Sequence, residues 1–385
     1  MLRPVTAPRA AAALLLLGLL APAVAHADEG DWQATLAGGF EAWFPEQSGG
    51  HGWALFDLQG GDVAGGRFRL HYNTDTLHLA LERMELGTPK VQLTAWLRGQ
   101  AIFAGLLMDY YQNGQSRPEL AFYASYVQAG TEWKWLPADH HSLALELSLR
   151  RWFFRETSDT AETLALPPEA WVFEPRLAYT FWKIRAPAEE WEPHRFFPRV
   201  QGVAFGLRLG LDVRSDSRAW GRASSTRNDP GDVIFSAHQW LRAGVEAHPL
   251  VRLQLEQHAS WGEGQDDLTR HRAGGMNPYV IAIPGLPWAA ILSERLFAAQ
   301  LSVHVKIAPD SRHELGALFA AGAFNDLDRS GALDTFDFAA GAGAFADLRF
   351  GRWQIHLRFA GAIPLDWLSG DPWLSALLTL GARLR

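Results

Sequence analysis

The residues whose types and spacing best suit chemistry form a run of oxygen-bearing side chains in the last quarter of the chain. The candidate calcium ligands are Asp326, Asp328, Ser330, Ala332 (through its carbonyl), Asp334 and Asp337, with glycine at position 331. This is the spacing of an EF-hand calcium loop, in which glycine permits the sharp turn and carboxylates supply hard oxygen ligands. The last position is Asp rather than the longer Glu, so we expect weak affinity. The alternative is a solvated Asp/Ser/Gly turn.

No catalytic constellation is visible in the sequence. The run Asn-Gly-Gln-Ser at 113–116 is similar to the Asn-Gly-x-Ser of outer-membrane phospholipases, but Gln112 and Tyr110 stand where the serine nucleophile and its histidine belong. No Gly-x-Ser-x-Gly, His-Glu-x-x-His or Walker loop occurs. The chain has no cysteine, which excludes thiolate catalysis and disulfides. We therefore expect a protein that is not an enzyme, with an outer-membrane lipid-acting enzyme as the least favoured alternative.

Composition and the N-terminus indicate where the protein works. The 385 residues carry a formal charge of −7 at pH 7, so no basic stripe is available for nucleic acid. Two arginines precede the apolar run 10–20, and Ala-His-Ala at 25–27 supplies small residues before a cleavage point. This predicts a secretory signal peptide over 1–27 and one mature domain over 28–385. No later run of 18 apolar residues exists, so we expect no membrane helix.

The mature chain alternates between apolar and polar residues with a period of two. The clearest segments are 77–82, 91–98, 143–150, 203–214, 300–306, 336–349, 353–359 and 376–385. Such a period predicts strands with one apolar and one polar face. Two architectures fit: a soluble sandwich buries the apolar faces between sheets, whereas a membrane barrel turns them toward lipid.

Three features favour the barrel. The segments are about 10–14 residues long, which suits a tilted membrane-spanning strand. The polar faces carry charges that suit a wet lumen: Arg208, Asp212, Arg214, Glu256, His258, Arg349 and Arg358. Aromatic residues gather near segment ends, as interface girdles do: Trp133, Trp135, Trp152, Phe153, Phe154, Trp171, Trp191, Phe196 and Phe197. The sequence thus predicts an all-β fold, a transmembrane antiparallel β-barrel of the bacterial outer membrane.

The links between segments predict the topology. Short links recur at 73–75, Gly99-Gln100, 137–140, His248-Pro249, 308–311 and Gly351-Arg352. Longer links alternate with them at 112–118, 156–170, 215–233, 262–292, 325–334 and 365–372, and the one exception is 186–198, a long link on the side of the short turns. Barrel turns are short on the periplasmic side and long outside, so we assign the longer set to the cell exterior. The pieces 32–43 and 53–72 are the weakest, and because closed bacterial barrels favour even numbers we predict about 16 strands.

The link 262–292 is long, apolar and rich in glycine and proline, and such loops tend to be functional. Its residues of interest are Arg272, Gly274, Gly275, Asn277, Pro278, Pro284, Gly285 and Leu286, followed by Glu294. Their order resembles the sixth extracellular loop of the surface-antigen (BamA/TamA-like) superfamily of barrel-assembly and translocation factors. The resemblance covers the barrel, best over 250–385. It implies that the loop, between strands 11 and 12, folds back into the lumen.

Two tip positions depart from that family. Pro284 stands where the family has an arginine that would pair with lumenal carboxylates, and Leu286 stands where it has an aromatic residue. The mature chain enters the barrel almost at once, so we expect a barrel without POTRA domains. The resemblance implies transport or insertion across the outer membrane. We expect a monomer in contact with outer-membrane lipids and lipopolysaccharide, with a protein or lipid client. The alternative is a passive porin-like channel for ions or small solutes.

Overall fold

The structure of the protein is a computed structural model. It describes residues 32–44, 49–63, 66–73, 76–100, 106–108, 111–112, 115–116, 118–184, 201–222, 228–275, 281–286, 291–309, 311–325, 336–363 and 374–384. The expected signal peptide, 1–27, lies outside these residues and stays a prediction. Over the described residues, no helix is long and apolar enough to cross a membrane.

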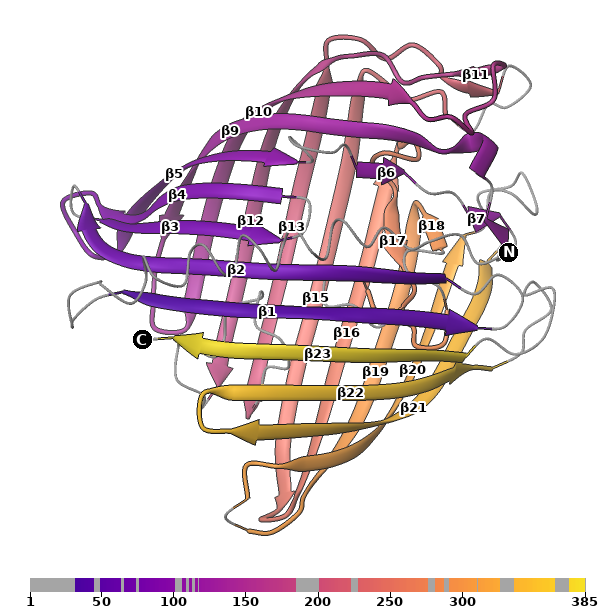
Figure 1. Ribbon diagram of the computed structural model, residues 1–385. Coiled ribbons are helices and arrows are strands. Elements are labelled where there is room, and N and C mark those ends of the chain that lie inside the picture. The colour runs from indigo at the N-terminus through magenta and orange to yellow at the C-terminus, as the bar shows by residue number, and fades with distance from the viewer. Residues whose placement is uncertain are drawn as a thin grey trace.

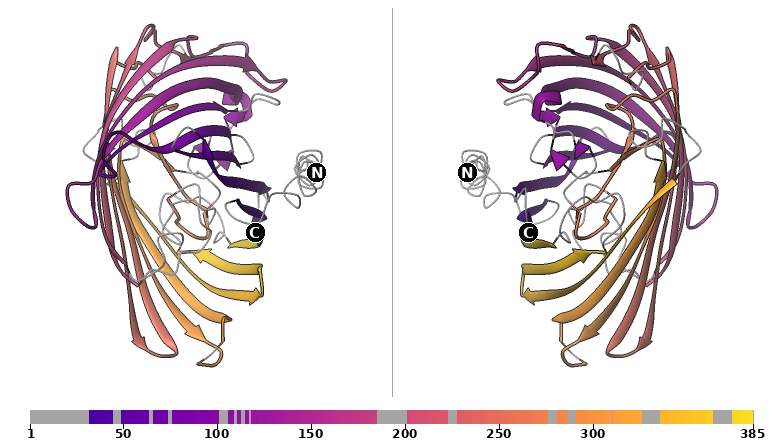
Figure 2. Two further views of the ribbon diagram at one scale, coloured as in Figure 1. Left: turned by 90° about the vertical axis from the view of Figure 1, so that its left-hand side faces the viewer. Right: turned by 90° about the vertical axis from the view of Figure 1, so that its right-hand side faces the viewer.

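Sixteen antiparallel strands form a closed barrel, as the alternation predicts (Figures 1 and 2). In chain order they are β1 (Gln33–Phe44), β2 (Gly49–Val63), β3 (Gly66–Asn73), β4 (Thr76–Glu85), β5 (Val91–Gln100), β9 (Phe122–Trp135), β10 (His141–Glu156), β12 (Trp171–Ile184), β13 (Gly202–Arg214), β15 (Val233–His248), β16 (Val251–Glu263), β19 (Arg295–Lys306), β20 (Glu314–Asn325), β21 (Phe336–Phe350), β22 (Trp353–Ala362) and β23 (Leu374–Leu384).

The other elements are short. They are β6 (Leu106–Met108), β7 (Tyr111–Gln112), β8 (Gln115–Ser116), the 3-10 helix η1 (Pro118–Leu120), β11 (Leu164–Ala165), β14 (Gly221–Arg222), β17 (His271–Ala273) and β18 (Ile291–Ser293). Strand β6 pairs with β9 beyond the end of β5, so β5 and β6 share one neighbour in the wall. Strands β11 and β14 pair with each other and connect two of the long links.

The first and last strands close the ring. Their antiparallel register runs from Ala34 opposite Leu384 to Phe44 opposite Leu374, which is nearly the whole length of β1. An open sheet would expose unpaired backbone groups to lipid, where each costs several kcal/mol. Closure by β1 and β23 therefore makes a membrane-spanning wall from strands alone.

Two of the predicted links are wrong. Gly99 and Gln100 lie within β5, opposite Val127 and Tyr126 of β9, and a glycine paired in a strand does not require a turn. The chain turns instead between β4 and β5, over 86–90, where Gly87 has a φ of 73°. The link after Asn73 joins β3 to β4 on the side where the long links lie, because β3 starts at the other end of β2. The weak piece 53–72 covers most of two strands, β2 and β3, and with both of them the wall has the predicted 16 strands.

The apolar faces point outward. Large apolar side chains on the outer face are exposed, for example Leu97, Leu145, Leu177, Leu209, Phe297, Leu301, Phe319, Phe359 and Leu378. Exposed aromatic rings gather at both ends of the wall: Phe153, Trp171, Trp261 and Phe336 at the end with the long links, and Trp133, Trp135, Phe350 and Trp353 at the other. These are the apolar band and the two aromatic girdles of an outer-membrane barrel. Trp152 and Phe154, predicted for a girdle, instead pack in an inner cluster with Phe122 and Trp220.

Aromatic rings on the inner face cover glycines directly opposite them in the neighbouring strand. Trp96 faces Gly130, Trp240 faces Gly206, and Phe345 faces Gly316. A Cβ added at Gly130 would lie 2.5 Å from the Trp96 ring and 2.8 Å from the carbonyl oxygen of Leu147. The ring thus fills the space that a side chain would take, and it shields the glycine backbone from the lumen.

We expect Gly130→Ala to destabilise the barrel by about 1–3 kcal/mol, the usual cost of overpacking a filled site. Denaturant unfolding in detergent micelles measures this loss. The control is Gly381→Ala on β23, whose added Cβ would meet only ordinary contacts at 3.7 Å. Equal midpoints for the two variants would contradict the role given to the Trp96 ring.

Candidate functional site

The described part of the segment between β16 and β19, residues 264–275, 281–286 and 291–294, lies in the barrel interior and is here called the lumenal loop (Figures 1 and 2). These are strands 11 and 12 of the wall, as predicted. The loop goes in and returns as a short hairpin, in which β17 pairs with β18 from His271 opposite Ser293 to Ala273 opposite Ile291. Gly274 and Gly275 follow β17 with φ values of 113° and 83°, a conformation that favours glycine.

A buried carboxylate holds the base of the lumenal loop. Asp266 is fully buried, and Arg214 at the end of β13 donates to both of its oxygens, at 2.7 and 3.0 Å. The indole Nε1 of Trp220 donates to the same carboxylate at 2.9 Å. Burial raises the pKa of Asp266, but the hydrogen bonds and charge of Arg214 outweigh it and hold the pKa below its ordinary value of 3.8. The base is therefore fixed to the wall and to the neighbouring long link.

A second set of ion pairs ties the two ends of the base together. Arg270, which is buried, donates to the carboxylate of Asp267 and, at 3.2 Å, to that of Glu294. Asn228, from the link before β15, pairs with Asp267 through its side-chain oxygen and nitrogen, at 2.9 and 3.1 Å. Arg272 donates to the backbone oxygen of Asp267 at 3.2 Å. The entry and exit of the loop are thus held side by side.

The exit of the loop is joined to β20 by a buried polar pair. Ser293 and Asn325 are both fully buried, and the Ser293 hydroxyl bonds the Asn325 side chain. The backbone N–H of Arg295 donates to Asn325 Oδ1 at 2.8 Å, and that of Asn325 donates to Ser293 Oγ at 3.1 Å. These bonds set where the loop rejoins the wall.

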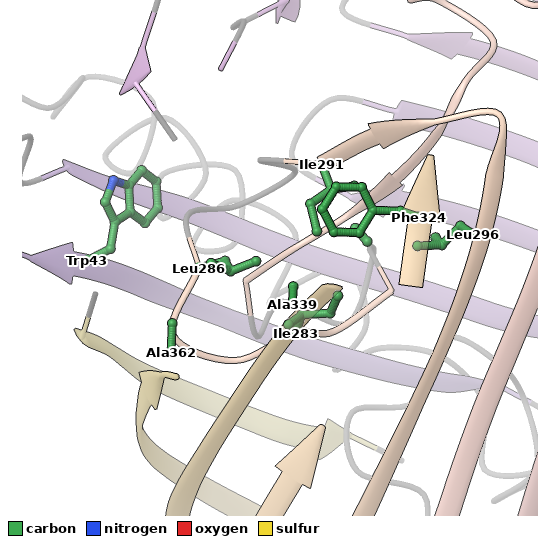
Figure 3. Close-up of a cluster of buried hydrophobic side chains, with 9 residues drawn as sticks. Trp43, Ile283, Leu286, Ile291, Leu296, Phe324, Ala339 and Ala362 are labelled. Atoms are coloured by element: carbon green, nitrogen blue, oxygen red, sulfur yellow. The ribbon is translucent and has the colours of Figure 1, made fainter. Parts of the chain in front are cut away.

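The tip of the loop, Ile283-Pro284-Gly285-Leu286, lies on the inner wall near the ring closure. Ile283 and Leu286 are fully buried, in one cluster with Trp43 of β1, Ala339 of β21 and Ala362 of β22 (Figure 3). The backbone N–H of Gly285 donates to the hydroxyl of Ser375 on β23 at 3.1 Å. The tip is thus held by apolar packing and by the hydrogen bond from Gly285 to Ser375.

Glycines on both sides allow the tip to approach the wall closely. A Cβ at Gly341 of β21 would lie 1.8 Å from the carbonyl oxygen of Pro284. A Cβ at Gly285 itself would lie 2.0 Å from the backbone nitrogen of Ala362, and its φ of 88° also favours glycine. A Cβ at Gly322 of β20 would lie 3.0 Å from Cδ1 of Ile283. Contacts this short are possible only without side chains.

The inward fold of the loop therefore agrees with the resemblance, while the tip makes a different kind of contact. Where the family's arginine would form an ion pair, the chain has Pro284, and its carbonyl lies against Gly341. Leu286 fills an apolar site in place of an aromatic ring. Of the predicted loop residues, Arg272 and Glu294 lie in the base, and Gly285 and Leu286 lie in the tip. Asn277 and Pro278 lie outside the described residues.

The inner wall carries charge networks, as expected, and one of them was missed. Glu174 on β12 is fully buried and accepts from Arg150 at 3.1 Å, from Arg176 at 3.0 Å and from Gln128 at 2.6 Å. The predicted lumenal residue Glu256 accepts from Arg242 at 2.8 Å. The Pro175 beside Glu174 interrupts the alternation of its strand, which hid Glu174 from sequence reasoning.

The calcium prediction falls mostly outside the described residues, which include none of Asp326, Asp328, Ser330, Ala332 and Asp334. Asp337 is the second residue of β21 and lies opposite Phe324. Over the described parts of the chain, no group of three or more potential metal ligands is present. Calcium binding at 326–337 stays a prediction.

For the loop base, Asp266→Asn leaves the buried guanidinium of Arg214 without its charge partner. We expect the free energy of opening of the base, which sets its protection against hydrogen exchange, to fall by about 3–5 kcal/mol, the cost of breaking a buried pair. Hydrogen exchange of residues 264–275, followed by mass spectrometry, measures it. The matched control is Asp216→Asn, which removes a partner of the exposed Arg218 and leaves exchange in the base unchanged. Similar exchange in both variants would show that the Asp266–Arg214 pair does not hold the base.

The same ion pair, Asp266 with Arg214, predicts how hydrogen exchange of the base depends on pH. Because the pKa of Asp266 is lowered on folding, its ionised form stabilises the base above pH 3.8, and this contribution is lost only as pH falls through the lower folded pKa. The difference in exchange between wild type and Asp266→Asn is therefore constant from neutral pH to about pH 5 and shrinks below pH 4. A difference that disappears between pH 7 and pH 5 would contradict this assignment.

For calcium, we expect thermal unfolding to shift upward as calcium binds the folded state, with half-saturation near 10⁻⁴–10⁻³ M, roughly as in weak extracellular sites. Asp328→Ala abolishes the shift, and magnesium at equal concentration serves as the control. An unchanged melting temperature, or a shift that Asp328→Ala retains, counts against the site.

The structure can be compared with known proteins. No protein-family model matches the sequence, and no curated protein sequence matches it. BamA from Haemophilus ducreyi lacking POTRA domains 1–3 matches in structure with a TM-score of 0.62 at 12% identity, over 91% of this chain and 70% of that chain. CdiB from Acinetobacter baumannii and CdiB from Escherichia coli each match with a TM-score of 0.55, at 9% and 12% identity.

The two CdiB matches cover 92% and 91% of this chain, which spans only 60% and 63% of the length of the CdiB chains. Identities this low bear on the fold and not on the activity. The resemblance predicted from the loop is thus confirmed for the fold, and the chain is an outer-membrane β-barrel of the BamA-like and CdiB-like architecture.

Proposed function

We propose that the protein works in transport or insertion across the bacterial outer membrane, with the lumenal loop controlling passage through the barrel. The observation that supports this most directly is the loop itself, whose base is held by buried ion pairs and whose tip is docked farther along the inner wall, on β20 to β23. A segment fixed at one end and docked at the other is suited to act as a gate, because the tip can leave the wall while the base stays in place.

The outer face of the barrel supports a proposal for its surroundings. The exposed leucine, valine and phenylalanine side chains contact lipid tails, and the two aromatic girdles lie at the membrane interfaces, with lipopolysaccharide on the exterior side. Because β1 pairs with β23, the ring needs no strand from a second copy, which supports a monomer. The client is a protein or lipid segment, and we assign no catalytic role to the chain.

Conductance in planar bilayers tests the proposed gate. We expect purified wild-type barrel to give small or intermittent currents, because the loop occupies part of the lumen. Deletion of residues 276–288, which removes the tip and leaves the clamped base, gives larger and steadier currents. Gly381→Ala, a small change on the inner wall remote from the loop contacts, serves as the control and behaves as wild type.

The alternative of a passive porin-like channel gives a different result. Steady open currents of equal size from the wild type and the deletion would show that the loop does not control passage, and that outcome would replace the present proposal with the passive channel.

A further inference from the structure

The base and the tip of the lumenal loop are held by forces of different strength. In the base, Arg214 and Arg270 are buried against Asp266, Asp267 and Glu294, and separating any of these pairs would leave a charge without a partner inside the protein. The tip, Ile283–Leu286, contributes no charged side chain, and the hydrogen bond from its Gly285 N–H to the Ser375 hydroxyl joins neutral groups. Neutral hydrogen bonds exchange readily with water. The tip is therefore the part that leaves first.

The surface beneath the tip has a defined shape. It consists of Gly322, Ala339, Gly341, Ala362 and Ser375 on four consecutive strands, β20 to β23, and is here called the tip-docking wall. Its small residues bring the backbone of an occupant within contact of the backbone of the wall. Trp43, only 6% exposed, borders it from β1. Such a surface selects for an uncharged segment, because a charge buried against these small apolar residues would lose its water.

We propose that the tip-docking wall is a binding site for an apolar peptide segment of a client, that this segment contains a Pro-Gly turn, and that residues 281–286 are the resident occupant of the site. This deepens the proposed function, on which it rests, by naming the chemistry of the client at the gate. A client segment that takes the place of the tip holds the loop open while it is bound.

The contacts of the resident tip define what the site accepts. Glycine is required at the position of Gly285, because a Cβ there meets the backbone of Ala362 at 2.0 Å. The N–H of that glycine must reach the Ser375 hydroxyl, and the carbonyl before it must lie against Gly341. The residue after it fills the apolar position of Leu286, beside Trp43 and Ala362 (Figure 3). The site thus recognises an apolar residue, then a residue whose carbonyl lies against Gly341, then glycine, then a second apolar residue, and Ile283-Pro284-Gly285-Leu286 supplies this order.

A peptide-binding experiment on the full barrel tests this. The probe is a fluorescent peptide with the sequence of residues 281–286, Ile-Ala-Ile-Pro-Gly-Leu, and binding is followed by fluorescence anisotropy in micelles. In the variant Ile283→Ser with Leu286→Ser, the resident tip no longer holds the wall. We expect this released variant to bind the probe at least about tenfold more tightly than wild type, since a tenfold change corresponds to about 1.4 kcal/mol.

Two controls locate the bound peptide. In the released background, Gly341→Val fills the site and returns the affinity to the wild-type level, whereas Gly381→Ala on β23 leaves it unchanged. A second peptide, with alanine in place of glycine, binds the released variant no better than it binds wild type. This peptide control needs no further change in the protein, so it decides the question even where Gly341→Val does not fold.

Equal affinity of wild type and released variant overturns the proposal, and so does equal binding of the two peptides. These outcomes are independent of the conductance test. Peptide binding can fail while deletion of 276–288 still opens the barrel, in which case the gate stands and its client has other chemistry. If the peptide binds as expected but deletion of 276–288 leaves the conductance unchanged, the binding site is supported and the gate is not.

Discussion

The pairing of β1 with β23 is the contact on which the rest of the structure depends, because it converts a sheet into a wall with an inside and an outside. Once the ring is closed, the two faces of each strand have different surroundings. Leucine and phenylalanine side chains on the outer face contact lipid, and charged side chains on the inner face pair with one another in the interior. Inner charges are placed in groups within a strand and between neighbouring strands, such as Glu174 with Arg176 on β12 and with Arg150 on β10, since a carboxylate buried without a partner would be costly.

Closure also creates the surface that receives the lumenal loop. The tip docks beside the seam, with Trp43 on the first strand and Ser375 on the last both in contact with it or its cluster. Small residues on the inner faces of β20 to β22 leave room for this contact, so the packing of the loop depends on which residues the wall has at these positions. The base depends on charge and not on small residues, since each of its buried charged side chains needs a partner of opposite charge.

Much of the fold was predictable from the sequence, because lipid outside and water inside impose a strict period on every wall strand. The strand number and the position of the loop between strands 11 and 12 followed from this period and from link lengths. Gly99-Gln100 was mistaken for a turn since glycine within a paired strand has the same local signature. Contacts that join distant segments, such as Asp266 with Arg214 or Gly285 with Ala362, have no local signature. The alternation placed Gly341 on the inner face, but only the docked tip explains why that residue is glycine.

The hairpin of β17 and β18 has a consequence for how this barrel can change over time. His271 lies opposite Ser293, so the chain leaves and re-enters the base at neighbouring points whatever lies between them. The entropic cost of a longer or shorter insert grows only with the logarithm of its length. The segment between these two points can therefore change in length or sequence, by evolution or by engineering, while the base and the strand order of the wall are kept, provided that residues 281–286 still fit the small residues of β20 to β23.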